Sequence, residues 1–152
     1  MSRVQLALNV NDIDEAVTFY SKLFGAEPAK RRPGYANFAI AEPPLKLVLL
    51  ENPGQGGSLN HLGVEVDGIG TVDAEQTRLA AAGLDLADER DTTCCYAKQD
   101  KFWVKDAPNG ESWEFYTVLE DSATFYGAGD SQACCGGPAG SAAETAAGTA
   151  CC

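Results

Sequence analysis

The residues that decide the fold are two alternating stretches, Val-Gln-Leu-Ala-Leu-Asn-Val at 4–10 and Asn-His-Leu-Gly-Val-Glu-Val at 60–66. In both, every second residue is a branched aliphatic, a pattern that predicts a strand with one buried face. Gln5 and His61 hold the same place in the two stretches, because each precedes a valine by five residues. The repetition predicts an internal duplication.

Each predicted strand leads into a helix and then into further strands. A helix is predicted at about 12–24, where Asp12 and Glu15 resemble a capping box and Gly25 follows the last apolar residue, and a second at about 72–82. Further strands are predicted at 35–40, 45–50, 102–104 and 112–118. The sequence therefore predicts an α+β protein in which each half reads strand, helix, then two or three strands.

Length and composition favour one folded domain with a small-molecule partner. The chain has 152 residues, of which 45% are hydrophobic and 22% charged, close to the average of globular proteins. A formal net charge of -11 argues against binding to nucleic acid or to an anionic membrane. Neither a membrane-spanning run nor a signal-peptide core is found, so a cytoplasmic location is expected, and the oligomeric state is left open.

The composition changes near the end of the chain. After Tyr126 there are no aromatic residues, and most positions are Gly, Ala or Cys. Such a segment buries too little apolar surface to offset the entropy of ordering it. We expect a folded domain at 1–120, with modules at about 1–55 and 56–120, and a flexible Gly/Ala/Cys-rich tail at 121–152.

All six cysteines occur as adjacent pairs. Neighbouring Cα atoms lie about 3.8 Å apart, below the usual disulfide range of about 4.4 to 6.8 Å, so a bridge within a pair is strained. We therefore expect free vicinal thiols in a reducing compartment. The pairs are Cys94-Cys95, Cys134-Cys135 and Cys151-Cys152.

Three polar residues take equivalent places in strand patterns and are candidate metal ligands. Gln5, His61 and Glu114 each lie opposite the packed row of their strand. An amide oxygen, an imidazole and a carboxylate can hold a divalent ion and leave positions open for substrate or dioxygen. Taken singly, Gln5 and His61 are more often ordinary strand residues, whereas Glu114 lies between Trp113 and Phe115 and needs a cation or several donors there.

These residues carry a resemblance to a known family. Residues 4–12 and 60–67, with the ending Asp-Ala-Pro-Asn-Gly-Glu-Ser-Trp-Glu at 106–114, resemble the vicinal oxygen chelate superfamily of glyoxalases, extradiol dioxygenases and bleomycin-resistance proteins. The resemblance implies two βαβββ modules that form an open barrel around a metal site. It also implies that Gln5, His61 and Glu114 are the metal ligands.

Within that superfamily, the segment Asp-Thr-Thr-Cys-Cys-Tyr-Ala-Lys-Gln-Asp-Lys-Phe-Trp-Val at 91–104 looks like the loop of ArsI-type carbon–arsenic lyases. This resemblance implies an Fe(II)-dependent dioxygenase that converts trivalent organoarsenicals, such as methylarsenite and trivalent aromatic arsenicals, to arsenite. Cys94 and Cys95 would bind arsenic, and dioxygen would be the co-substrate. The usual iron triad has two histidines, so Gln5 is a departure.

Other interpretations remain open. Cys134, Cys135, Cys151 and Cys152 are either accessory arsenic-binding thiols or exposed thiols on a linker. Lys98 and Lys101 either lower the pKa of the neighbouring thiols or are solubilising charges. The rival functions are a thiol-based protein that sequesters cadmium or arsenite, and an extradiol dioxygenase or glyoxalase-like metalloenzyme.

Overall fold

The computed structural model describes residues 1–105 and 107–127. The first half contains β1 (Arg3–Val10), α1 (Ile13–Phe24), β2 (Lys30–Arg32), β3 (Tyr35–Ile40) and β4 (Leu45–Glu51). The second half contains β5 (Leu59–Glu65), α2 (Ile69–Ala81), β6 (Leu86–Cys94), β7 (Ala97–Val104) and β8 (Trp113–Asp121). Both halves therefore have the βαβββ order, which confirms the predicted α+β modules.

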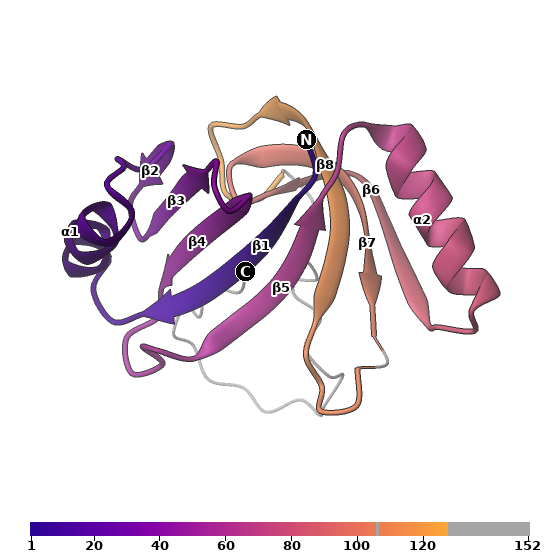
Figure 1. Cartoon of the computed structure of the whole chain (residues 1–152), viewed down its shortest axis with the longest axis horizontal. Helices are drawn as coiled ribbons and strands as arrows, with labels where there is room; N and C mark the ends of the chain where they lie inside the picture. Colours follow the sequence, from indigo (N-terminus) through magenta and orange to yellow (C-terminus); the bar gives the residue numbers. More distant parts are fainter. Residues whose placement is uncertain (106, 128–152) are drawn as a thin grey trace.

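The strands form one curved, eight-stranded sheet in the order β2-β3-β4-β1-β5-β8-β7-β6 (Figure 1). The order is symmetric about the centre, because β1 and β5 pair antiparallel there while β4 and β8 run parallel to them on either side. The two modules are thus joined through their first strands. This arrangement brings the first and the last strands of the modules, which carry the predicted ligands, next to one another.

The register of β1 and β5 explains why Gln5 and His61 are equivalent. Leu6 pairs with Leu62, Gln5 with Gly63, and Ala7 with His61. A two-fold rotation between Leu6 and Leu62 therefore exchanges Gln5 with His61, as the repeated sequence pattern predicts. The side chains of Gln5 and His61 are on the same face of the sheet, because strand side chains alternate.

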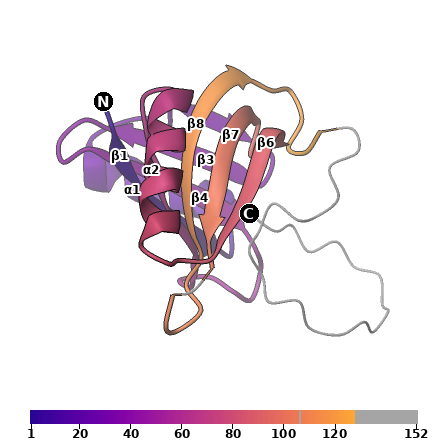
Figure 2. The same ribbon diagram turned by 90° about the vertical axis from the view of Figure 1, so that its right-hand side faces the viewer.

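The two helices cover the outer face of the sheet at its opposite ends (Figures 1 and 2). Asp12 caps α1 by accepting hydrogen bonds from the amides of Asp14 and Glu15, and Gly25 ends it with φ at 62°. Helix α2 begins at Ile69, three residues before the predicted start. Each helix packs on its own apolar cluster, made of Ile13, Val17, Ala36, Phe38, Leu47 and Leu49 for α1 and of Val66, Val72, Leu79 and Phe102 for α2.

A third cluster lies on the concave side of the sheet and joins the two modules. It contains Ala7, Tyr35, Val48, Leu50 and Cys94. Phe125 and Tyr126 pack against this cluster, and Tyr126 forms a β-bridge with Cys94. Packing contacts therefore continue beyond the expected boundary at 120. Most of the tail expected at 121–152 lies outside the described residues.

The strands that sequence patterning missed have polar inward faces. β6 contains the run Asp-Glu-Arg-Asp, and the part of β7 before residue 102 includes Gln99 and Lys101, which are buried despite their polarity. Apolar alternation is absent from this part of β7 because its inward residues line a polar cavity. It is absent from β6 because this edge strand is polar on both faces, with Asp88 and Arg90 bonded to residues of α2. In the part of the chain that the structure describes, no helix is long and apolar enough to cross a membrane.

Candidate metal and thiol site

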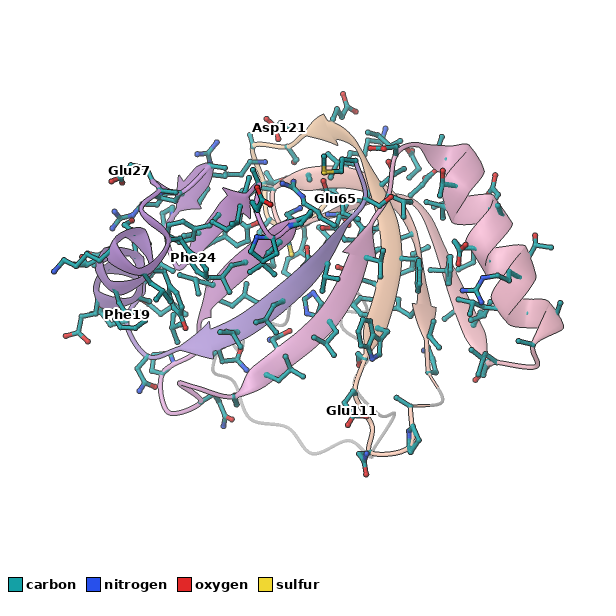
Figure 3. All side chains as sticks on the ribbon, in the orientation of Figure 1. Phe19, Phe24, Glu27, Glu65, Glu111 and Asp121 are labelled. Atoms are coloured by element: carbon teal, nitrogen blue, oxygen red, sulfur yellow. The ribbon has the colours of Figure 1, made fainter. Side chains whose placement is uncertain are left out.

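The concave side of the sheet encloses a cavity of about 300 Å³. Its walls come from both modules and include all five candidate site residues of the described chain, namely Gln5, His61, Cys94, Cys95 and Glu114. Glu65 and Asp121, which also line the cavity, lie in the upper part of Figure 3, and Glu111 lies near its lower edge. The structure thus gathers residues that are more than 100 positions apart into one site.

Gln5, His61 and Glu114 converge at their polar ends. The Gln5 amide nitrogen lies 3.0 Å from His61 Nε2 and 2.7 Å from Glu114 Oε1. His61 Nε2 and Glu114 Oε1 are 3.4 Å apart. All three side chains are buried, at 4% to 5% exposure. Three polar side chains that meet in a closed cavity stabilise one another only through such contacts or through a shared ion.

The size of this triangle fits one divalent metal ion. Ligand atoms about 2.1 Å from an ion lie about 3.0 Å apart at right angles and about 3.4 Å apart in a tetrahedral arrangement. No group of three His, Cys, Asp or Glu residues among the described positions is placed to hold a metal, so a metal bound to His61 and Glu114 would need the Gln5 amide as its third protein donor. The donor set of amide oxygen, imidazole and carboxylate suits a divalent ion of intermediate hardness.

Hydrogen bonds allow the Gln5 amide to present its oxygen. In the structure its nitrogen points to His61 and Glu114, and its oxygen accepts a hydrogen bond from the Tyr116 hydroxyl at 2.5 Å. A half-turn of the amide exchanges the two atoms. The nitrogen then donates to the Tyr116 hydroxyl oxygen, and the single hydroxyl proton is left for Glu65, whose carboxylate lies 2.9 Å away.

A chain of asparagines holds His61 in the orientation that a ligand requires. Its Nδ1 lies 2.7 Å from Asn60 Oδ1, so the proton is on Nδ1 and the lone pair of Nε2 points into the cavity. The Asn60 amide donates to Asn9 Oδ1 at 2.9 Å, and Asn9 donates to Ser58 Oγ at the same distance. The network fixes both the tautomer and the ring plane of His61.

Lys101 supplies the cation that a buried Glu114 requires. Burial alone would raise the pKa of the Glu114 carboxyl, but the charge of Lys101, with a further contribution from the neighbouring His61, outweighs burial and lowers the pKa to about 2. The Lys101 ammonium lies 3.2 Å from Glu114 and 3.6 Å from Glu89, and its side chain is 1% exposed. Glu114 is therefore ionised at neutral pH and able to bind a cation.

Gly63 makes room for the converging ligands, a role that sequence reasoning did not assign. A Cβ at this position would lie 3.0 Å from Glu114 Cγ and 3.3 Å from Gln5 Cβ. Since both distances are tighter than ordinary contacts, any side chain here would push the two residues apart. The signal was present in the sequence, because Gly63 interrupts the polar row of its strand between His61 and Glu65.

The thiol pair lies at the two-residue turn between β6 and β7. Cys94 pairs with Ala97, while Cys95 and Tyr96 form the turn with φ values of 56° and 61°. Two consecutive positive φ values define a type I′ turn, which favours Asn and Gly. Cys and Tyr therefore carry backbone strain here, and such strain concentrates at functional sites.

Cys94 and Cys95 are not joined in a disulfide, and their sulfur atoms are close enough to act together. Their sulfur atoms are 3.1 Å apart, well beyond the S–S bond length of about 2.05 Å. Cys94 is buried at 2% exposure and Cys95 is half-buried, and both line the cavity. The other two cysteine pairs, Cys134-Cys135 and Cys151-Cys152, lie outside the described residues.

The structure corrects the interpretation of the two nearby lysines. Lys101 is buried against Glu114, so it is not a solubilising charge. Lys98 forms ion pairs with Asp91 at 2.7 Å and with Glu120 at 3.6 Å. Spacing in the sequence could not separate these roles, because only the alternation of β7 decides that residue 101 faces the cavity.

Trp103 is a further cavity residue that the sequence did not single out. Its ring meets the His61 ring edge to face, with centroids 5.6 Å apart, and Lys101 lies 4.9 Å from the centroid of the indole. Its buried Nε1 has no hydrogen-bond partner among the described residues. Trp103 therefore adds a buried hydrogen-bond donor without a described partner to the wall of the cavity.

Comparison with known proteins agrees with this fold. Residues 3–115 match the model of the Glyoxalase/Bleomycin resistance protein/Dioxygenase superfamily. The chain is 55% identical over the full length of both proteins to the "Trivalent organoarsenical cleaving enzyme" of Thermomonospora curvata. It is 70% identical to the "Cadmium-induced protein CadI" of Mycobacterium bovis over 82% of each chain.

A solved structure shows the same fold at low sequence identity. The Mn(II)-bound glyoxalase from Novosphingobium aromaticivorans superposes with a TM-score of 0.55 at 22% identity, over 82% of this chain and 42% of that one. The chain therefore belongs to the glyoxalase, bleomycin-resistance and dioxygenase superfamily, also called the vicinal oxygen chelate superfamily. Its close similarity to a named organoarsenical-cleaving enzyme supports an enzyme of this superfamily.

Proposed function

We propose that the protein is a cytoplasmic Fe(II)-dependent dioxygenase that cleaves the carbon–arsenic bond of trivalent organoarsenicals and releases arsenite. The observation that carries the proposal is that the vicinal thiols Cys94 and Cys95 and the three converging donors line one cavity. Thiols bind trivalent arsenic, and the donors fit a divalent ion. The named relative at 55% identity supports the same activity.

The thiol pair captures the substrate. A trivalent organoarsenical R–As(OH)₂ reacts with two thiols to give an arsenic bonded to both sulfurs and to R, with release of two waters. The second thiol adds about 10² to 10⁴ in apparent affinity, because its effective concentration is high once the first has reacted. The turn geometry keeps the sulfurs adjacent, so little further ordering is needed.

The chain's own residues then define where the reaction takes place. Gln5, His61 and Glu114 would hold the metal, with positions left open. Bound Fe(II) would supply an ion that binds and activates dioxygen beside the carbon–arsenic bond. For methylarsenite the balance is one dioxygen consumed and one arsenite plus one formaldehyde formed. Lys101 keeps Glu114 ionised, and the apolar cluster around Tyr35 and Val48 excludes bulk water from one side of the cavity.

A second candidate function is sequestration of cadmium or arsenite. It is favoured by the 70% identity to a protein named for its induction by cadmium. Sequestration, however, gives no role to the buried triad, whose convergence requires a lysine counter-ion and a glycine without a side chain. Turnover distinguishes the two functions.

The deciding experiment is to load the protein with Fe(II) without air, add methylarsenite, admit air and measure arsenite and formaldehyde. Cys94→Ser and Cys95→Ser should each lose most cleavage while keeping bound iron, since one sulfur no longer fixes the carbon–arsenic bond. The matched control replaces Cys134, Cys135, Cys151 and Cys152 with Ser and should keep most turnover.

A sequestration protein gives the opposite pattern. Arsenic capacity would then fall in proportion to the thiols removed, wherever they lie, and no arsenite would form from methylarsenite. Full cleavage by Cys94→Ser would exclude capture of arsenic by two thiols.

A further inference from the structure

Gln99 on β7 is a buried polar residue of the cavity wall. Its side chain is 4% exposed and lines the same cavity as the thiols. Its amide nitrogen donates to the backbone carbonyl of Cys94 at 3.2 Å. Because a carbonyl only accepts, the orientation of the amide is fixed with the nitrogen toward Cys94. The oxygen Oε1 has no hydrogen-bond partner among the described residues.

The position of Gln99 lies between the thiols and the candidate metal ligands. Alternate residues of β7 line the cavity, beginning with Ala97, which pairs with Cys94. Lys101, two residues beyond Gln99 on the same face, reaches Glu114. The Gln99 side chain is therefore one strand repeat from the thiol turn and one repeat from the triad. An atom attached to thiol-bound arsenic and directed toward the triad would therefore lie beside Gln99.

The chemistry of trivalent arsenic decides what that atom is. With both sulfurs bonded, arsenic keeps a single further substituent. Methylarsenite and two thiols give (RS)₂As–CH₃ and two waters, and arsenite and two thiols give (RS)₂As–OH and two waters. Only the arsenite adduct carries a hydrogen-bond donor at this place.

We propose that Gln99 Oε1 accepts a hydrogen bond from the arsenic-bound hydroxyl of arsenite held by Cys94 and Cys95. The inference rests on the proposed function, since it assigns the thiol pair to arsenic. It makes the substrate site also a binding site for the inorganic product. A buried acceptor that stays unpaired beside a methyl group and becomes paired beside a hydroxyl favours the hydroxyl adduct.

The test compares two ligands that differ only in this group. Arsenite and methylarsenite are titrated into metal-free, air-free full-length protein in which Cys134, Cys135, Cys151 and Cys152 are replaced with Ser. Methyl and hydroxyl groups are close in size, so the ratio of the two dissociation constants isolates the hydrogen bond. Effects of a mutation on the thiol turn cancel in that ratio, because both ligands use the same two sulfurs.

Three variants of Gln99 separate the acceptor from the donor. Gln99→Leu and Gln99→Met remove the acceptor and should shift the ratio against arsenite by about fivefold, the effect of one hydrogen bond. Gln99→Glu loses the amide donor to Cys94 but keeps an acceptor oxygen, and should leave the preference for arsenite nearly unchanged. The two apolar variants serve as replicates if one folds poorly.

An unchanged ratio in both apolar variants would overturn the proposal, as would an equal loss in Gln99→Glu. Failure of the proposed function looks different. If neither arsenical binds to Cys94 and Cys95 in the parent protein, the capture step itself is wrong. If both bind but the ratio does not respond to Gln99, only the role of Gln99 is wrong.

Discussion

The two modules share one backbone plan but differ in what they bring to the cavity. By the strand registers, Gly63 pairs with Glu114 in the second module, and Ala7 pairs with Val48 at the equivalent place in the first. The first module thus has an apolar residue where the second has a carboxylate. The duplication supplies the geometry, and single side chains on that geometry decide where a cation can bind.

The turns that follow the same plan differ as well. In the first module β2 and β3 are joined by Pro33 and Gly34, and the residue with positive φ is a glycine. In the second module the corresponding turn contains Cys95 and Tyr96, both with positive φ. The β2–β3 turn therefore has glycine where φ is positive, whereas the β6–β7 turn has Cys and Tyr at such positions and a strained backbone. This contrast indicates that the thiol of Cys95, rather than the ease of forming the turn, accounts for the residue at this position.

The largest effects on metal binding and turnover are expected from changes to the candidate ligands His61 and Glu114. His61→Ala and Glu114→Ala should each weaken Fe(II) binding by at least about 100-fold, since even changes to residues behind a ligand cost about 10- to 100-fold. Turnover should fall to background. The matched change in the first module, Val48→Ala, should cost about 2 kcal/mol of stability and keep the metal.

Metal content after dialysis and thermal unfolding measure these outcomes. Unchanged iron in Glu114→Ala would remove that residue from the site. Gln5→Ala should be milder than either, because a neutral amide contributes less to binding a cation than a carboxylate.

A smaller effect on metal binding is expected from a change at Gly63, and none from a change at Ala7, its equivalent in the first module. Gly63→Ala places a methyl 3.0 Å from Glu114 Cγ, so Glu114 or Gln5 must move by a few tenths of an ångström. We expect about tenfold weaker metal binding. Ala7→Gly, the reverse change in the first module, should keep metal affinity and lose about 1 kcal/mol of stability. Equal metal affinities in the two variants would contradict a positioning role for Gly63.

The lowered pKa of Glu114 predicts that the stability of the metal-free protein depends on pH. Because the pKa of Glu114 falls from 4.5 to about 2 on folding, its contribution to stability is present above about pH 4.5 and is lost as the pH drops toward 2. Glu114→Gln has no such group. The difference in unfolding free energy between the two proteins should therefore shrink across this range, and a constant difference would argue against an ionised Glu114.

The smallest effect is expected from removal of residues 128–152, which should change the melting temperature by about 2 °C or less. Removal of residues 121–127 as well should lower it by several degrees. That second cut deletes Phe125 and Tyr126, which pack against the cluster joining the modules. Equal melting temperatures after both cuts would show that the domain needs nothing beyond residue 120.

The sequence predicted those parts of the fold whose side chains follow a period. β1 and β5 alternate between a partly buried aliphatic row and a buried row that contains Gln5 and His61. Helix α1 has a cap and a glycine stop, and the repeat paired Gln5 with His61. Most of β7 was missed because its inward residues are polar, and β6 was missed because it is an edge strand with polar residues on both faces. A strand that lines a polar cavity has no hydrophobic period for sequence reasoning to detect.

Residue types by themselves determined which chemistry was available: two adjacent thiols, and an amide, an imidazole and a carboxylate at equivalent strand positions. Only the tertiary structure decided that these groups share one cavity, that Lys101 is the counter-ion of Glu114, and that the buried oxygen of Gln99 has no hydrogen-bond partner among the described residues. The physical reason is that sheet register and curvature arise from long-range pairing, between β1 and β5 and between β7 and β8. Local sequence predicts the alternation of side chains along a strand, but it does not predict which other strand pairs with it.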